Sequence, residues 1–285
     1  MSITRVGIIG SGIMGSGIAE TAAVNGFEVV LRSRSKNTAD ATVAALEKSL
    51  NRQVEKGKRT AEERDAALGR VTATSDLHAL ATVDLVIESV VEDLAVKKEL
   101  FNELDRITDD GAVLATNTST LPVVELAMQT GRPEKVCGIH FFNPAPVMSL
   151  VEVVRPITAS EETVAAAFTF AEACGKTPVE VKDQAGFIVN ALLFPYLNNA
   201  VRLAEAGVAS IDDIDTAMKG GCGFPMGPFA LLDLVGLDTS LAILDALYDE
   251  FRDPNYAAVP LLRRMVAAEL FGRKSGKGFF DYSGR

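Results

Sequence analysis

The chain has 285 residues, of which 48% are hydrophobic, enough for a large core in one large or two ordinary domains. Its formal net charge of -10 argues against a nucleic-acid-binding or membrane-surface protein. Two histidines and three scattered cysteines predict no metal site and no disulfide framework, and they favour a reducing cytoplasm. No apolar run approaches the ~20 residues of a membrane span, and we expect no signal segment.

A glycine-rich turn follows the first predicted strand, residues 6–9. It reads Gly10-Ser11-Gly12-Ile13-Met14-Gly15, and helix-forming residues and a second predicted strand, residues 27–31, come after it. In such a motif the first glycine makes the turn, the second lets a pyrophosphate approach the backbone, and the third lets the helix pack on the strand. The helix N-terminus then faces the anion. The motif predicts dinucleotide binding.

The end of the second strand governs the choice of cofactor. Enzymes that use NAD normally carry Asp or Glu there, to accept hydrogen bonds from the ribose hydroxyls. Here Ser33 stands in that place, between Arg32 and Arg34. Because guanidinium groups suit a 2′-phosphate, the segment favours NADP over NAD. The alternative is a solvated loop in a protein that binds NAD through its pyrophosphate.

A predicted pair of helices, residues 38–56 and 60–68, interrupts the strand pattern. Lys48, Arg52 and Lys56 are spaced four apart, so they share one helix face. In an acidic protein this basic island suits a phosphorylated ligand. The alternative is a solvated face whose acidic neighbours balance the charge.

Two further strands, residues 83–87 and 111–115, flank a predicted helix at residues 94–106. The second ends in the polar run Thr116-Asn117-Thr118-Ser119-Thr120, at the edge of an open α/β sheet where active sites lie. For Ser119 the alternative role is a helix cap. The repeated alternation of strand and helix predicts a parallel, doubly wound sheet.

One of the two histidines, His140, follows the short apolar strand predicted at residues 136–139. Two prolines then force a turn, and a second apolar run, residues 150–154, carries Glu152 in its middle. If that run folds back beside the first, the carboxylate reaches the imidazole, fixes its tautomer and stabilises its charged form. The alternative is a His and a Glu on unrelated loop ends.

A helix at residues 160–174 and a strand at 178–181 complete the first predicted domain, residues 1–183. Residues 184–285 read as helices only and predict a second domain. Its first helix, residues 187–205, is apolar on most of its circumference, which predicts burial at a subunit interface. Asn190 is polar within it, so it is either a core-facing amide or a group aimed into a cleft.

With these landmarks the chain resembles the 3-hydroxyacyl-CoA dehydrogenase family, and within it the short members that act on 3-hydroxybutyryl-CoA. The resemblance covers essentially the whole chain. The segments that carry it, in order and spacing, are Gly10 to Gly17, Asn117 to Ser119, His140 to Glu152, Gly186 to Asn190, Phe224 to Pro228 and Lys274 to Phe279.

The resemblance implies roles for particular residues. It implies a catalytic pair of His140 and Glu152, with Ser119 and Asn190 around the reacting oxygen atoms of the substrate. The positions that match cofactor contacts of the family are Glu92, Lys97, Ser119, Asn143 and Lys274, and those that match coenzyme A contacts are Ser49 and Lys56. It also implies a homodimer formed through the C-terminal helices. The family's acid after the second strand is absent, with Ser33 in its place.

The expected protein is therefore a Rossmann-like doubly wound sheet with a helical-pair insertion, followed by an all-α C-terminal domain. The expected activity is reversible NAD(P)-dependent oxidation of a (3S)-3-hydroxyacyl-CoA, such as 3-hydroxybutyryl-CoA, to the 3-oxoacyl-CoA. One alternative is a related dehydrogenase of a free sugar acid. Another is a non-catalytic nucleotide-binding protein on the same scaffold.

Overall fold

The computed structural model describes residues 2–284, and the chain divides into two compact units, Met1–Gln184 and Ala185–Arg285. Each unit has its own hydrophobic core. None of the helices within residues 2–284 combines the length and apolar character that crossing a bilayer requires.

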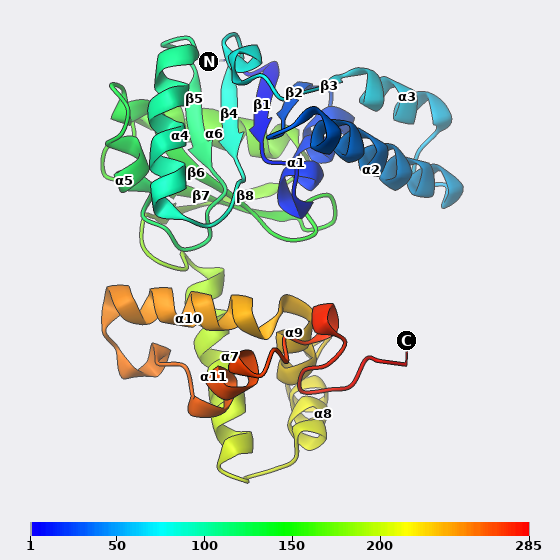
Figure 1. Cartoon of the computed structure of the whole chain (residues 1–285), viewed down its shortest axis with the longest axis vertical. Coiled ribbons are helices and arrows are strands. Elements are labelled where there is room, and N and C mark those ends of the chain that lie inside the picture. Colours follow the sequence, from blue (N-terminus) through cyan, green and yellow to red (C-terminus); the bar gives the residue numbers. More distant parts are fainter. Residues whose placement is uncertain (1, 285) are drawn as a thin grey trace. The chain divides into compact units, whose positions relative to one another are not determined.

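The first unit is built on one eight-stranded sheet with strand order β3-β2-β1-β4-β5-β6-β7-β8 (Figure 1). The strands are β1 (Arg5–Ile9), β2 (Glu28–Arg32), β3 (Val71–Thr74), β4 (Leu85–Glu88), β5 (Val113–Thr116), β6 (Val136–Phe141), β7 (Leu150–Arg155) and β8 (Thr177–Lys182). The first six run parallel, whereas β7 is antiparallel to β6 and parallel to β8. The sheet is therefore mixed, and the expected Rossmann-like fold is confirmed.

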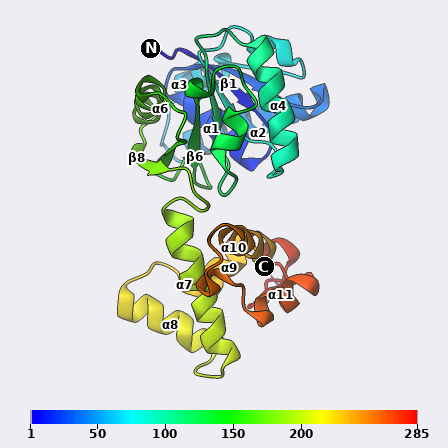
Figure 2. The same ribbon diagram turned by 90° about the vertical axis from the view of Figure 1, so that its left-hand side faces the viewer.

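Helices cover both faces of this sheet. They are α1 (Ile13–Val24), α2 (Lys36–Glu55), α3 (Ala61–Gly69), α4 (Leu94–Ile107), α5 (Val123–Ala127) and α6 (Glu161–Ala173), with short 3₁₀ helices η1 (Leu77–Leu80) and η2 (Pro133–Lys135). Figure 2 shows α4 on one side of the sheet and α6 on the other. The predicted helical pair is α2 and α3, and α3 begins with a capping box formed by Thr60 and Glu63.

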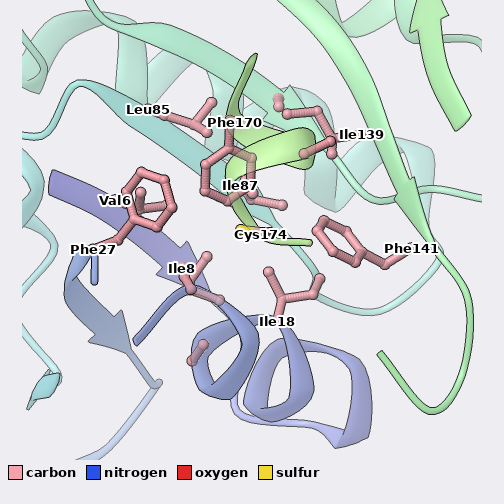
Figure 3. Packing of buried hydrophobic residues seen from close by; sticks show 14 of the residues in the cluster. Val6, Ile8, Ile18, Phe27, Leu85, Ile87, Ile139, Phe141, Phe170 and Cys174 are labelled. Carbon is pink, nitrogen blue, oxygen red and sulfur yellow. The ribbon is translucent and has the colours of Figure 1, made fainter. Parts of the chain in front are cut away.

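The main core of this unit follows from strand alternation, because successive side chains of a strand point to opposite faces. Val6 and Ile8 of β1 pack with Ile18 of α1 in one buried cluster, which also contains side chains of α6 (Figure 3). Within the cluster the rings of Phe27 and Phe170 meet edge to face, with centroids 5.1 Å apart. These contacts fix α1 and α6 on the same face of the sheet.

Strand β3 is the one strand of the described sheet that was not predicted from the sequence. It has four residues, Val71 to Thr74, and none of its side chains is fully buried. Its residues alternate between apolar and polar, but over four positions with small side chains, which is a weak strand signal in sequence. It pairs in parallel with β2 and extends the sheet by one strand beyond β2, the strand that ends at Arg32.

The second unit is helical, as expected (Figures 1 and 2). Its helices are α7 (Val189–Glu205), α8 (Ile211–Cys222), α9 (Pro228–Val235), α10 (Leu237–Phe251) and α11 (Pro260–Ala267), with 3₁₀ helices η3 (Pro254–Tyr256) and η4 (Arg273–Ser275). Ser210 caps α8, since its hydroxyl accepts from the Asp213 N–H. Gly236 separates α9 from α10 with φ at +103°, a conformation that side chains rarely adopt.

Candidate active site

His140 and Glu152 are cross-strand neighbours in the antiparallel pair β6–β7. Ile139, Phe141 and Val151 point into the core cluster that holds α1 and α6. By alternation, His140 and Glu152 project from the opposite face of the sheet, directly across from each other. The fold-back predicted from the two prolines is confirmed.

The contact between the two side chains is short and buried. His140 Nδ1 lies 2.7 Å from Glu152 Oε2, and the two residues are 4% and 0% exposed. A carboxylate in this place accepts the Nδ1–H proton, which leaves Nε2 as the basic nitrogen. The Phe142 ring lies against the imidazole, with centroids 4.6 Å apart.

Ser119 completes a chain of three side chains. Its Oγ lies 2.9 Å from His140 Nε2, the nitrogen that Glu152 leaves unprotonated. The alternative role of Ser119 as a helix cap is not what the structure shows. Asp183 caps α5 instead, because its carboxylate accepts from the Val123 and Val124 N–H groups at 2.9 and 2.7 Å. Burial raises the pKa of this carboxyl group above its usual value.

Glu92 lies beside the turn that carries Ser119. Its Oε1 accepts the Ser119 N–H at 3.0 Å and also a hydrogen bond from the Thr118 hydroxyl. Its Oε2 lies 3.3 Å from the ammonium of Lys97. The structure thus brings together five predicted site residues: Glu92, Lys97, Ser119, His140 and Glu152.

A second carboxylate, Glu88, is a residue to which the sequence analysis gave no role. It ends β4, is 0% exposed, and accepts from Lys97 Nζ at 2.6 Å. Its position in the sequence could have indicated a role, since Glu88 is an acid at the end of a buried apolar strand. Ionisable groups are rarely fully buried unless they are paired.

The glycine turn between β1 and α1 has the shape that a pyrophosphate requires. Gly10 has φ at +115°, and a Cβ there would lie 2.2 Å from the Ser89 carbonyl oxygen. A Cβ on Gly15 would lie 1.9 Å from the Gly10 carbonyl oxygen, so both positions need glycine. A Cβ on Gly12 meets nothing within 4 Å, and α1 begins there without a side-chain cap. The exposed N-terminus of α1 is thus open to an anion, which fits a dinucleotide.

The segment at the end of β2 lies next to this turn, since the Gly10 N–H donates to the Arg32 carbonyl at 3.0 Å. Arg34 is exposed, whereas Ser33 is buried. Arg32 Nε and Ser33 Oγ are both buried without a hydrogen-bond partner among the described residues. Buried polar atoms normally have partners. The exposed Arg34 is the side chain of this segment that a ligand can reach.

The loop between β6 and β7 carries Asn143, which is exposed. The loop is held from two sides. The ammonium of Lys176 donates to the Ala145 and Met148 carbonyls at 2.7 and 2.9 Å. Gly17 of α1 approaches so closely that an added Cβ would lie 3.2 Å from side-chain atoms of Ala145 and Pro146. Lys176 was not predicted, because its partners lie about thirty residues away in sequence.

The predicted basic island lies on α2. Lys48 and Arg52 line a surface groove of about 400 Å³ together with Glu47 and Glu55, and Lys56 is exposed at the end of the helix. Ser49 is half-buried on the same helix. The lining of the groove thus carries both signs of charge.

Two predicted site residues, Asn190 and Lys274, belong to the second unit. Asn190 lies in the first turn of α7. Lys274 lies in η4, where its ammonium is 2.6 Å from Asp238 Oδ2. Their roles in the site stay predictions.

The first unit therefore combines an open glycine turn with a Ser119–His140–Glu152 chain in which the histidine and the glutamate are buried. Such a chain moves a proton at Nε2 while the carboxylate stabilises the charged ring. A dinucleotide-binding turn together with a general acid–base group is typical of the oxidoreductases that use a nicotinamide cofactor.

Comparison with known proteins specifies the family. Residues 5–184 match the model "3-hydroxyacyl-CoA dehydrogenase, NAD binding domain", and residues 186–282 match "3-hydroxyacyl-CoA dehydrogenase, C-terminal domain". A 3-hydroxybutyryl-CoA dehydrogenase of Mycobacterium tuberculosis is 50% identical over 283 residues, which cover 99% of each chain. The mitochondrial hydroxyacyl-coenzyme A dehydrogenase of Homo sapiens is 42% identical, over 98% of this chain and 91% of the human one.

Comparison with solved structures indicates the same family. The crystal structure of (S)-3-hydroxybutyryl-CoA dehydrogenase from Ralstonia eutropha superimposes with a TM-score of 0.96 at 41% identity, over 99% of both chains. The chain belongs to the 3-hydroxyacyl-CoA dehydrogenase family. The resemblance inferred from the sequence is confirmed.

Proposed function

We propose that this protein reversibly oxidises (3S)-3-hydroxybutyryl-CoA, and related 3-hydroxyacyl-CoA substrates, to the 3-oxoacyl-CoA. The observation that carries the proposal is the hydrogen-bonded chain from Ser119 through His140 to Glu152. It stands in a chain that is 50% identical to a 3-hydroxybutyryl-CoA dehydrogenase over nearly its full length.

In this proposal His140 is the general base. Its Nε2 takes the proton of the 3-hydroxyl group during oxidation and returns it to the forming alkoxide during reduction. Glu152 holds the Nδ1–H and stabilises the positive charge on the ring. The turn of Gly10, Gly12 and Gly15 would hold a nicotinamide cofactor, which would supply the hydride chemistry at carbon 3 of the substrate.

Ser119 and Asn190 are proposed as hydrogen-bond donors to the substrate oxygen. Ser119 Oγ already lies on the Nε2 side of the imidazole, where the substrate hydroxyl must also bind. A donor in this place stabilises negative charge as it develops on oxygen. Asn190 takes the second donor role by the family pattern.

We further propose that the cofactor is NADP in preference to NAD. What supports this is the absence of an acid at Ser33 and the presence of Arg32 and Arg34 beside it. Arg34 is exposed just after β2, so its guanidinium group is available as a donor. A 2′-phosphate would use such donors, whereas the ribose hydroxyls of NAD prefer an acceptor.

One assay tests the reaction and the cofactor together. Reduction of acetoacetyl-CoA is followed at the absorbance of the reduced nicotinamide, with NADH and NADPH in parallel, in the wild type and in His140→Gln. We expect turnover with a preference for NADPH, and a loss of roughly 10²–10⁴ in kcat for the variant. Absence of turnover with both cofactors would reject the reaction. A strong preference for NADH would reject the NADP assignment alone.

The coenzyme A part of the proposal rests on Ser49 and Lys56 of α2, which match family contacts. Charge reversal, Lys56→Glu, should raise KM for acetoacetyl-CoA because it places a carboxylate near phosphate groups. The free acid acetoacetate should be unaffected. Lys36→Glu, at the other end of α2, is the matched control for net charge. An equal effect on both substrates would favour a dehydrogenase of free acids.

We propose that the second unit forms a homodimer. What supports this is α7, whose Leu192 and Leu203 are exposed in the single chain although the helix is largely apolar. Val208 and Phe224, near α8, are exposed as well. Exposed apolar side chains on neighbouring helices are typical of a subunit interface. Sedimentation equilibrium of the wild type and of Leu192→Glu tests this, and a monomeric wild type would reject it.

A further inference from the structure

A buried ammonium group joins two carboxylates beneath the turn that carries Ser119. Lys97 Nζ is 2.6 Å from Glu88 Oε1 and 3.3 Å from Glu92 Oε2. Lys97 is 1% exposed and Glu88 is 0% exposed, whereas the Glu92 side chain is 42% exposed. Glu88 is thus the buried end of this group, and Glu92 is the end that reaches the surface.

The two carboxylates hold the Ser119 turn at two points. Glu88 Oε2 accepts from the Thr116 hydroxyl at 2.8 Å, and that hydroxyl accepts the Thr118 N–H at 3.2 Å. Glu92 accepts from the Thr118 hydroxyl and from the Ser119 N–H. Both routes end within one residue of the Ser119 side chain.

We propose that Lys97 and Glu88 are positioning residues for the Ser119 hydroxyl, acting through Glu92 and Thr116 and not by contact with the cofactor or the substrate. The inference rests on the proposed function, in which Ser119 and His140 act on the substrate oxygen. It departs from the family pattern, in which Lys97 matches a cofactor contact.

Glu88 can hold the turn in place because both of its carboxylate oxygens are already engaged in hydrogen bonds. Glu88 Oε1 also accepts the Val90 N–H at 2.6 Å, so both of its oxygens are occupied. Hydrogen bonds between ionised groups are short and strong, and they are strengthened in a poorly solvated place. They therefore restrict the turn far more than exposed pairs do. The adjacent Lys98 offers the comparison, since its ion pair with Glu125 lies at the surface.

The first test is spectroscopic and does not need turnover. The imidazole nitrogens of the two histidines are observed by ¹⁵N NMR, and His78→Gln assigns the His140 signals. Ser119→Ala gives the Nε2 chemical shift without the serine hydrogen bond. The double variant Glu88→Gln/Lys97→Met removes both buried charges, so neither is left unpaired in the fold.

We expect the double variant to move the His140 Nε2 signal toward its position in Ser119→Ala. The matched control Lys98→Met, which removes the neighbouring ammonium on α4, should leave the signal in place. An unchanged Nε2 signal in a folded double variant overturns the inference. If the double variant does not fold, Glu88→Gln alone, which keeps Lys97 paired with Glu92, supplies the same measurement.

The second test is a kinetic cycle with Ser119→Ala. In the wild-type background the double variant should lower kcat for acetoacetyl-CoA reduction by roughly 10- to 100-fold, as expected for a misplaced catalytic group. In the Ser119→Ala background it should change kcat by less than about twofold, because the two changes act through one group. NADPH affinity, measured by fluorescence titration, should hold within about twofold in both backgrounds.

Other results overturn the inference. Equal losses of kcat in both backgrounds would mean that Lys97 and Glu88 act independently of Ser119. Weaker NADPH binding in both backgrounds would make Lys97 a cofactor contact. If the wild type shows no turnover with acetoacetyl-CoA, the proposed reaction fails, and the NMR comparison still decides whether Lys97 and Glu88 position the Ser119 hydroxyl.

Discussion

His140 and Glu152 lie directly opposite each other on β6 and β7, with Nδ1 and Oε2 2.7 Å apart. The two strands, not a loop conformation, set this distance. The loop between them carries Asn143, and Lys176 and α1 hold that loop separately. The acid–base pair and the loop are thus fixed by independent contacts.

The first prediction concerns the charge of Glu152. Glu152→Gln keeps the size of the side chain but removes the charge that stabilises the imidazolium, so kcat should fall by roughly 10²–10⁴. Acetoacetyl-CoA reduction measures it, with circular dichroism to verify folding. Glu180→Gln, which changes a half-exposed carboxylate on β8, is the control and should retain normal kcat. Near-normal turnover of Glu152→Gln would contradict the assigned role.

The second prediction separates two glycines of the turn. Gly15→Ala places a Cβ 1.9 Å from the Gly10 carbonyl oxygen, so the backbone must move, and we expect a loss of about 1–3 kcal/mol in the free energy of unfolding. Gly12→Ala meets nothing within 4 Å and should unfold like the wild type. It should nevertheless bind NADPH more weakly, because the methyl group occupies the space of the pyrophosphate. Thermal unfolding and fluorescence titration measure the two effects, and an inverted pattern would disprove this account of the turn.

The third prediction concerns the end of β2. Ser33→Asp introduces the acceptor that ribose hydroxyls use and repels a 2′-phosphate. Replacing one charge-assisted contact by a repulsion should shift the ratio of kcat/KM for NADPH to NADH toward NADH by roughly 10- to 100-fold. Parallel steady-state assays give the ratio, and Ser35→Asp, at the exposed cap of α2, is the control. An unchanged ratio in Ser33→Asp would show that this position does not select the cofactor.

The fourth prediction concerns the thiols. Burial raises the pKa of Cys137 and Cys174 to about 12, whereas Cys222 is exposed at the end of α8. Because the thiolate is the reactive form, only Cys222 should react with a disulfide reagent in the native protein at pH 8. We expect one fast equivalent, all three thiols after denaturation, and none in native Cys222→Ser. A second fast equivalent would mean that the core around Cys174, visible in Figure 3, opens readily.

Local sequence patterns predicted most of the fold and of the candidate site. The glycine turn, the helical pair and the His140–Glu152 contact each depend on residues close in sequence or on strand periodicity, and each is present in the structure. Strand β3 escaped because it is short and half-exposed. Where boundaries were predicted, they differ from those of the structure by only a few residues at each end, where caps and not periodicity decide.

The contacts that escaped prediction join distant parts of the chain. Asp183, about sixty residues further along the sequence, caps α5. Ser119 therefore does not cap this helix, although its sequence position also suggested that role. Lys97 was matched to a cofactor contact, and its burial against Glu88 is visible only in three dimensions. When the sequence offers a side chain several chemically reasonable partners, the packing of the folded chain determines which of them it contacts.

The antiparallel pairing of β6 and β7 has a consequence for variation in this protein. Side chains alternate along both strands, so a slip of one residue would turn Glu152 into the core and bring Val151 or Val153 opposite His140. The buried valines resist such a slip, because it would turn Val151 and Val153 away from the core cluster in which they pack. Insertions or deletions in the loop that carries Asn143 should therefore change only the length of that loop. The distance between the His140 and Glu152 side chains should stay the same.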